Sequence, residues 1–280
     1  MYEAFYGLRE KPFSILPDPQ LIYWGPNHRL AFSMLEFGVM NSAGFTVITG
    51  EIGSGKTTLV RRLLRRLDPN INVGLISNTP HGRKELLQWI MMSLNQPFAE
   101  EYSQLLFSFQ QYLRAQYAEN RRTLLIIDEA QNLQPDALET LRMLSNINAD
   151  KDQFLQLIMV GQPQLKKLLC SPQLVQFAQR ISVDFHLKAL SANEVTRYID
   201  YRLQAVGASS PLFSDEACAA VAQASAGIPR TINILCDTAL VYSFAKQLDW
   251  VSKEIIDLVV ADKQDFGVFG QPRPATVINE

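Results

Sequence analysis

The sequence predicts an α/β fold, in which helices cover both faces of a mainly parallel sheet, followed by a C-terminal part made only of helices. Up to about residue 190, short apolar runs alternate with segments of helical periodicity, which is typical of parallel sheets with helical crossovers. Beyond residue 190 the strand-type runs stop, while helical patterns continue. A length of 280 residues agrees with a main domain and a smaller one.

The predicted strands are short runs rich in β-branched and other apolar residues. The first of them ends at Gly50, and four others follow along the chain. Between the runs, apolar residues recur at helical spacing, which predicts the crossover helices. The predicted strands are 45–49, 73–76, 124–127, 155–160 and 183–187, and the predicted helices are 28–41, 56–67, 83–94, 104–118 and 135–146.

Both ends of the chain differ in composition from the two predicted domains. The opening segment carries Pro12, Pro17 and Pro19 among aromatic residues, which predicts an extended arm. The capping box Ser191-Ala192-Asn193-Glu194 marks the start of the first C-terminal helix. The predicted organisation is an arm at 1–27, an α/β core at 28–190, a helical domain at 191–264 and a flexible tail or linker at 265–280.

Charge and cysteine content exclude several classes of protein. The formal net charge is -2, so the chain as a whole does not attract nucleic acid or anionic lipid. The three cysteines are far apart and lack metal-site spacing, which is typical of a reducing compartment. We find neither a signal peptide nor a run of about 18 apolar residues that could span a membrane. These features predict a cytoplasmic protein.

A glycine-rich motif follows the first predicted strand and opens the next helix. It matches GxxxxGK followed by Thr, the phosphate loop, in which glycines let successive amides approach a phosphate at a helix N-terminus. Lys56 would reach the β- and γ-phosphates of ATP, and the Thr57 hydroxyl would complete the shell of Mg²⁺. The alternative is a plain turn with a surface lysine. The predicted nucleotide-binding residues are Gly50, Glu51, Ile52, Gly53, Ser54, Gly55, Lys56, Thr57 and Thr58.

Two carboxylates end the third predicted strand. Asp128 and Glu129 follow four apolar residues, which is the Walker B pattern. Packing does not explain two acids there, because unpaired carboxylates are costly to remove from water, whereas bound Mg²⁺ would compensate the charge. Asp128 would hold the metal, and Glu129 would act as general base on the attacking water. The alternative is a pair of exposed acids that caps the helix near Pro135.

Two arginines are candidates for stabilising the charge of phosphoryl transfer. Arg180 ends the helical segment before the last predicted strand. Arg230 follows Pro229 in a first helical turn, where a cation opposes the helix dipole and a phosphate could hold it. For each arginine the alternative is a surface side chain in an ordinary ion pair.

Several short motifs, taken together, resemble one family. The phosphate loop is joined by Asp128-Glu129-Ala130-Gln131, Val160-Gly161-Gln162-Pro163, Gln179-Arg180-Ile181 and Gly227-Ile228-Pro229-Arg230. The arm adds Phe5-Tyr6-Gly7-Leu8, Lys11-Pro12-Phe13, Pro17-Asp18-Pro19, Tyr23 and His28. These segments are similar to the AAA+ ATPases of the ExeA/GspA secretion family, and the resemblance covers about residues 2–262. The motifs of the arm are more specific to that family than the phosphate loop.

The resemblance implies a P-loop NTPase sheet of order 5-1-4-3-2, a C-terminal helical lid, and active sites between the subunits of a ring. Arg180 would be an arginine finger that acts on a neighbouring subunit, and Arg230 a sensor in the lid. Gln162 lies in the family's first sensor region and would bind the nucleotide, and Asn78 would restrain Glu129. The arm around residues 17–23 would line the adenine pocket.

The resemblance also implies a function. Relatives use ATP to assemble type II secretion systems, pili or exopolysaccharide export machines, so we expect a homo-oligomer with a cell-envelope partner, in the cytoplasm or at the inner membrane through that partner. Several relatives continue into a transmembrane helix and a peptidoglycan-binding domain. The chain agrees either with a short member of the family or with an excised cytosolic fragment.

Two other functions stay open. A DNA-dependent ATPase of transposition, of the MuB or TniB kind, has a similar core, and basic pairs at 83–84 and 121–122 and a basic helix would suit DNA. The net charge favours the simpler explanation, a solvated helix face. A scaffold that binds nucleotide without turnover is the second alternative. The basic helix carries Arg61, Arg62, Arg65 and Arg66.

Overall fold

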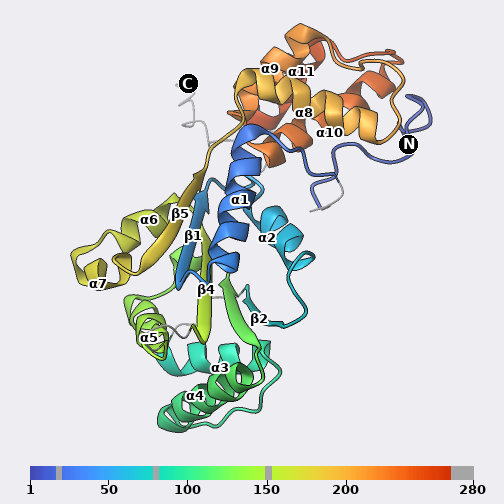
Figure 1. Cartoon of the computed structure of the whole chain (residues 1–280). Coiled ribbons are helices and arrows are strands. Elements are labelled where there is room, and N and C mark those ends of the chain that lie inside the picture. The colour runs from blue at the N-terminus through green and yellow to red at the C-terminus, as the bar shows by residue number, and fades with distance from the viewer. Residues whose placement is uncertain (17–20, 78–81, 149–152, 266–280) are drawn as a thin grey trace, which may run out of the picture. The chain divides into compact units, whose positions relative to one another are not determined.

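A computed structural model describes residues 1–16, 21–77, 82–148 and 153–265. The chain divides into two compact units (Figure 1). One unit is Pro26–Lys188, and the other combines Met1–Gly25 with the segment that begins at Ala189. The opening residues therefore pack with the C-terminal helices, although helix α1 (Pro26–Met40) follows them directly in the chain.

A five-stranded parallel sheet forms the centre of the first unit. Its order, β2-β3-β4-β1-β5, confirms the predicted order 5-1-4-3-2. Strands β1 and β4 are buried along their whole length, because helices cover both faces of the sheet, and this explains their continuous apolar sequence. The strands are β1 (Phe45–Gly50), β2 (Ile71–Ile76), β3 (Arg122–Ile127), β4 (Leu155–Gly161) and β5 (Ile181–Leu187).

Helices connect the strands as the periodicity predicts. Helix α1 packs on β5, β1 and α2, and α3 packs on β2, α4 and α5 (Figure 1). The buried faces of α3 and α4 form one apolar core with the sheet, in which Leu86 and Phe109 are fully enclosed. The other helices of this unit are α2 (Lys56–Leu64), α3 (Arg83–Ser93), α4 (Tyr102–Ala118), α5 (Pro135–Ser145), α6 (Pro163–Leu169) and α7 (Val175–Ala178), with 3₁₀ turns η1 (Ala130–Asn132) and η2 (Pro172–Leu174).

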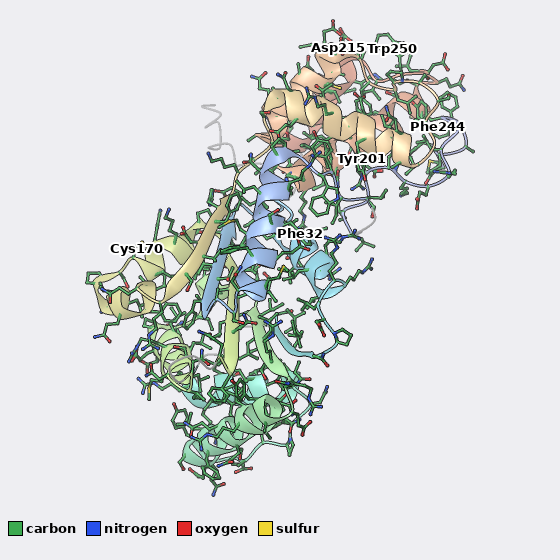
Figure 2. The ribbon with its side chains drawn as sticks, in the orientation of Figure 1. Phe32, Cys170, Tyr201, Asp215, Phe244 and Trp250 are labelled. Atoms are coloured by element: carbon green, nitrogen blue, oxygen red, sulfur yellow. The ribbon has the colours of Figure 1, made fainter. Side chains whose placement is uncertain are left out.

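The second unit is a helical domain with its own core. Its helices are α8 (Ala192–Ala205), α9 (Asp215–Ser225), α10 (Pro229–Ala245) and α11 (Lys253–Asp265). The capping box at the start of α8 forms as the sequence predicts, with the Glu194 carboxylate accepting from the Ser191 backbone. Figure 2 marks Tyr201 and Phe244 on this unit; their rings meet Tyr23 and Phe5 of the opening segment.

The opening segment is anchored to the helical domain by buried aromatic rings and hydrogen bonds. Tyr2 and Phe13 lie in the core of this unit, and the Tyr2 hydroxyl donates to Asp237. Arg202 of α8 is 6% exposed, and its Nε donates to the carbonyl oxygen of Pro12 at 2.6 Å. The Arg202 guanidinium also lies over the Tyr198 ring, 5.8 Å from its centre. A buried cation therefore fixes the path of the segment by binding its backbone.

We expect Arg202→Ala to loosen the opening segment from the helical domain. The change would leave the buried Pro12 carbonyl without its donor, at a cost of about 2 to 4 kcal/mol in local stability. Amide hydrogen exchange at Arg9, whose N–H donates to the Val206 carbonyl at 2.9 Å, measures the loss. Arg197→Ala, on the exposed face of the same helix, is the matched control. Equal exchange in the two variants would contradict this role of Arg202.

Candidate functional site

The phosphate loop lies between β1 and α2, as its sequence predicts. Gly53 and Gly55 have φ angles of 78° and 100°, a conformation that side chains other than glycine rarely adopt. Lys56 begins α2, and its Nζ donates to the carbonyl oxygens of Gly50 at 2.8 Å and Glu51 at 2.9 Å. The amine is thus held at the mouth of the loop by neutral acceptors that a phosphate group could replace.

The electrostatic surroundings of Lys56 suit an anionic ligand. Its side chain is largely buried, and this burial lowers the pKa of Lys56, while the nearby carboxylates of Glu129 and Asp128 oppose the shift. Removal from water makes the charged form of Lys56 costly, so a bound phosphate would stabilise it. The buried position of Lys56 therefore favours a site in which a bound phosphate contacts the ammonium.

Close packing behind the loop fixes its backbone. A Cβ atom on Gly50 would lie 2.9 Å from the carbonyl oxygen of Leu187, so only glycine fits there without a shift. His28 of α1 lies against the loop: its Nε2 is 3.0 Å from the carbonyl oxygen of Ser54, and it would meet a Cβ on Gly55 at 3.3 Å. In the sequence, His28 is selected only as part of the arm's resemblance to the family. In the structure, His28 contacts the phosphate loop.

Two oxygen ligands suited to a divalent cation come together beside the loop. The Thr57 hydroxyl of α2 donates to Asp128 Oδ2 at 2.9 Å, although the two residues lie 71 positions apart in the chain. Asp128 is 8% exposed and directly follows β3. A hydroxyl and a carboxylate are hard oxygen donors, which Mg²⁺ prefers, and Mg²⁺ needs few protein ligands when phosphates supply others. These residues therefore fit the ion that the sequence predicts.

The candidate base, Glu129, is held by two amide side chains. Its Oε2 accepts hydrogen bonds from Gln131 Nε2 at 2.7 Å and from Gln162 Nε2 at 3.2 Å. Glu129 itself has a left-handed backbone, with φ 53° and ψ 35°, which turns the chain sharply after β3. Gln162, predicted to bind nucleotide, thus contacts the base. Gln131 is a site residue that the sequence analysis did not select.

The other predicted site residues have different surroundings. Arg180 lies at the end of the α7 segment, where its Nη1 donates to the Arg142 carbonyl of α5 at 3.1 Å and to the Ser145 hydroxyl. Arg230 is an exposed residue in the first turn of α10, preceded by Pro229 at the first helical position. Asn78 lies outside the described residues, as do residues 17–20 of the arm.

Pairing with carboxylates neutralises part of the basic surface that would suit DNA. Arg66, which follows α2, bonds Glu36 of α1 at 3.0 Å and lies over the ring of Phe32, which Figure 2 marks on α1. Arg121 pairs with Glu119. Of the other cations of the predicted basic helix, Arg61 and Arg65 are exposed, as expected of a solvated face, whereas Arg62 is partly buried.

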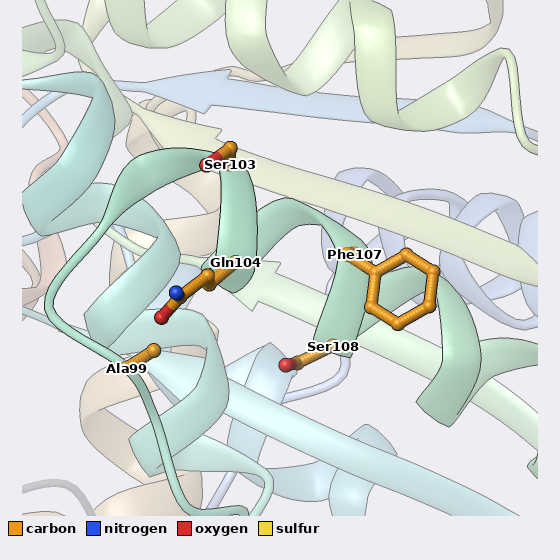
Figure 3. Close-up of a pocket in the computed structure, with 5 residues that line it drawn as sticks. All are labelled: Ala99, Ser103, Gln104, Phe107 and Ser108. Atoms are coloured by element: carbon orange, nitrogen blue, oxygen red, sulfur yellow. The ribbon is translucent and has the colours of Figure 1, made fainter.

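A separate surface cavity of about 370 Å³ lies at the start of α4 (Figure 3). Its lining contains no ionisable side chain, so it offers none of the groups that phosphate or metal chemistry needs. In the described part of the chain, no helix combines the length and the apolar character needed to cross a membrane. The cavity is lined by Ala99, Ser103, Gln104, Phe107 and Ser108.

Comparison with known proteins agrees with this geometry. A family model described as an AAA domain matches residues 39–169. General secretion pathway protein A of Aeromonas hydrophila is 39% identical over 248 residues, which are 88% of this chain and 45% of that protein. The chain thus spans less than half the length of this relative.

Solved structures with similar folds are distant in sequence. Cdc6p from Pyrobaculum aerophilum has a TM-score of 0.68 at 16% identity, over 90% of this chain and 70% of that one. The RuvB Holliday junction branch migration motor of Thermotoga maritima has a TM-score of 0.55 at 18% identity, over 91% of this chain and 76% of that one. At these identities the similarity shows the fold alone. The AAA-domain match and the 39% identity to General secretion pathway protein A confirm the predicted resemblance to the ExeA/GspA AAA+ ATPases.

Proposed function

We propose that this chain binds ATP with Mg²⁺ and hydrolyses it to drive or switch the assembly of a cell-envelope machine. The observation that supports it most is the hydrogen bond from Thr57 to Asp128, with Glu129 as the next residue. This contact joins the phosphate loop to the carboxylates that follow the C-terminal end of β3. Binding and hydrolysis would then take place at a single site.

Each residue has a defined task in the proposed reaction. The loop amides and Lys56 would bind the phosphates, and Thr57 with Asp128 would hold Mg²⁺. Bound Mg²⁺ would supply positive charge to the oxygens of the β- and γ-phosphates. Glu129 would orient a water and accept its proton as the new O–P bond forms and the bond from the γ-phosphorus to ADP breaks. Gln162 would contact Glu129 from the neighbouring strand end.

The proposal for the partners rests on the similar protein from Aeromonas hydrophila and not on the geometry of the site. General secretion pathway protein A carries secretion in its name, and we propose a type II secretion, pilus or exopolysaccharide export machine as the target. We propose a homo-oligomeric ring in the cytoplasm, in contact with the inner membrane through its partner. Arg180 would reach the neighbour's nucleotide, Arg230 would sense it from the helical lid, and Asn78 would restrain Glu129.

Phosphate release by the whole chain, measured with Mg²⁺ over a range of protein concentrations, tests this function. We expect specific activity to rise with concentration, because a subunit that receives an arginine from its neighbour is the active form. If ATP binds and no phosphate is released at any concentration, the chain is a nucleotide-gated scaffold and the hydrolysis assignment is wrong.

We expect Arg180→Ala to keep the affinity for ATP and to lose the increase in activity on assembly. A transition-state arginine from a neighbour contributes about 10³ to 10⁵ in rate, so the assembled variant should fall toward the rate of the isolated subunit. Nucleotide affinity and phosphate release are measured on the same preparation. Arg65→Ala, at an exposed residue that caps the C-terminus of α2, is the control. A variant that keeps the concentration-dependent rise would exclude Arg180 as the finger.

A further inference from the structure

We propose that Gln131 is a positioning residue, which orients the Glu129 carboxylate toward the water that attacks the γ-phosphate. This inference rests on the proposed hydrolysis by Glu129 and extends it to the residue that holds the base. Gln131 lies in η1, directly after the turn that carries Glu129, and its Nε2 donates to Glu129 Oε2 at 2.7 Å. This is the shorter of the two hydrogen bonds that Glu129 accepts from side chains in the described part of the chain.

The three side chains form a closed ring of hydrogen bonds between two strand ends. Gln131 Oε1 accepts from the backbone N–H of Gln162 at 2.9 Å, and Gln162 Nε2 donates to Glu129 Oε2 at 3.2 Å. Glu129 and Gln131 follow β3, and Gln162 follows β4, which pairs with β3. Gln131 therefore connects the base to the start of α6, and a shift of either strand end would move the carboxylate.

The position of both donors leaves one carboxylate oxygen available. Gln131 and Gln162 both bond Oε2, while Oε1 of Glu129 accepts no hydrogen bond from the described residues. Fixing one oxygen sets the rotation of the carboxylate group and so the direction of the other. We assign Oε1 to the water, because a base has to hold the proton it abstracts within hydrogen-bond reach.

The chemistry of position 131 suits glutamine. Its carboxamide has a donor for Glu129 and an acceptor for the Gln162 N–H, and both are used. Glutamate has similar size but no donor when ionised, and would place like charges together. The neighbouring Gly161 leaves room for this carboxamide, since a Cβ at that position would lie 2.8 Å from Gln131 Oε1.

Gln131→Ala and Gln131→Glu test this role, because loss of a positioning residue should lower kcat and leave the affinity for ATP nearly unchanged. Loss of a hydrogen bond to a charged group corresponds to a fall of about 10- to 100-fold in kcat, and the Kd for ATP should change by less than about twofold. Gln134→Ala, an exposed residue three positions on, is the matched control and should keep the wild-type kcat. Melting temperature and ATP binding report folding. A purely structural role would lower these two rather than kcat alone.

Two further variants keep the test decisive. Gly161→Ala should displace the Gln131 carboxamide without altering residue 131, and should lower kcat in the same way. Its Cβ would also lie 2.8 Å from Leu165 Cδ2, so the melting temperature of this variant is measured beside kcat. In a double-mutant cycle, Gln131→Ala and Gln162→Ala should be less than additive, because each breaks the same ring. Additive losses would separate the two residues and contradict the ring.

The outcomes also separate this inference from the hydrolysis proposal. Wild-type kcat in Gln131→Ala, beside an inactive Glu129→Gln, would overturn the positioning role and leave Glu129 as the base. A rise in kcat in Gln131→Ala would likewise overturn it, because the amides would then restrain the base. Normal turnover in Glu129→Gln would instead remove the base that both proposals use.

Discussion

Glu129→Gln is expected to bind ATP as tightly as the wild-type chain and to lose hydrolysis by about 10²- to 10⁴-fold, the usual contribution of a general base. The substitution keeps the size of the side chain and removes the negative charge that accepts the proton. Because Glu129 makes no contact with the phosphate loop among the hydrogen bonds of this site, binding should be preserved. Phosphate release under saturating ATP, with affinity measured by calorimetry, separates the two effects.

A second carboxylate is the control for the loss of charge alone. Glu100→Gln removes an exposed charge before α4 and should leave both turnover and affinity unchanged. Turnover near the wild-type rate in Glu129→Gln would mean that another group accepts the proton. The assignment of this residue, though not of the nucleotide site, would then be wrong.

Lys56→Ala is expected to weaken ATP binding by about 100-fold or more, since the ammonium that would bind the β- and γ-phosphates is lost. A hydrogen bond between charged groups contributes about 1.5 to 3 kcal/mol for each contact. The Lys56 amine also bonds Gly50 and Glu51, so the loop itself would be less well held. Titration with Mg-ATP measures the affinity directly.

The structure offers a matched control for the loss of a lysine. Lys166→Ala in α6 removes an exposed ammonium and should leave affinity unchanged. Lys56→Met keeps most of the buried chain and should lose as much affinity as Lys56→Ala. Affinity within about twofold of wild type in the folded variants would contradict the role of Lys56.

Most of the fold follows from local sequence patterns, because each pattern has a direct physical cause. Buried parallel strands need apolar residues on both faces, and this made β1 and β4 recognisable. The start of β2 was harder: it begins at Ile71, two residues before the predicted run, because Asn72 interrupts the apolar pattern. Helix α1 begins at Pro26 rather than at 28, since proline fits the first helical turn.

The phosphate loop and the Asp128-Glu129 pair could be predicted because the residues that carry their chemistry are adjacent in the sequence. Gln131 could not, since its partner Gln162 becomes its neighbour only when β4 pairs with β3. The available signal was that both glutamines closely follow strand ends that share one edge of the sheet. The buried Arg202 had no signal at all, because its acceptor is a backbone carbonyl of the opening segment.

The most direct test of the account is a calorimetric titration of the wild-type chain with ATP, first with Mg²⁺ and then with EDTA in excess. We predict one nucleotide per chain with Mg²⁺ and weaker binding without it, because Thr57 and Asp128 are positioned to hold the metal beside the phosphates. Folded protein that takes up no nucleotide in the presence of Mg²⁺ would contradict the central claim.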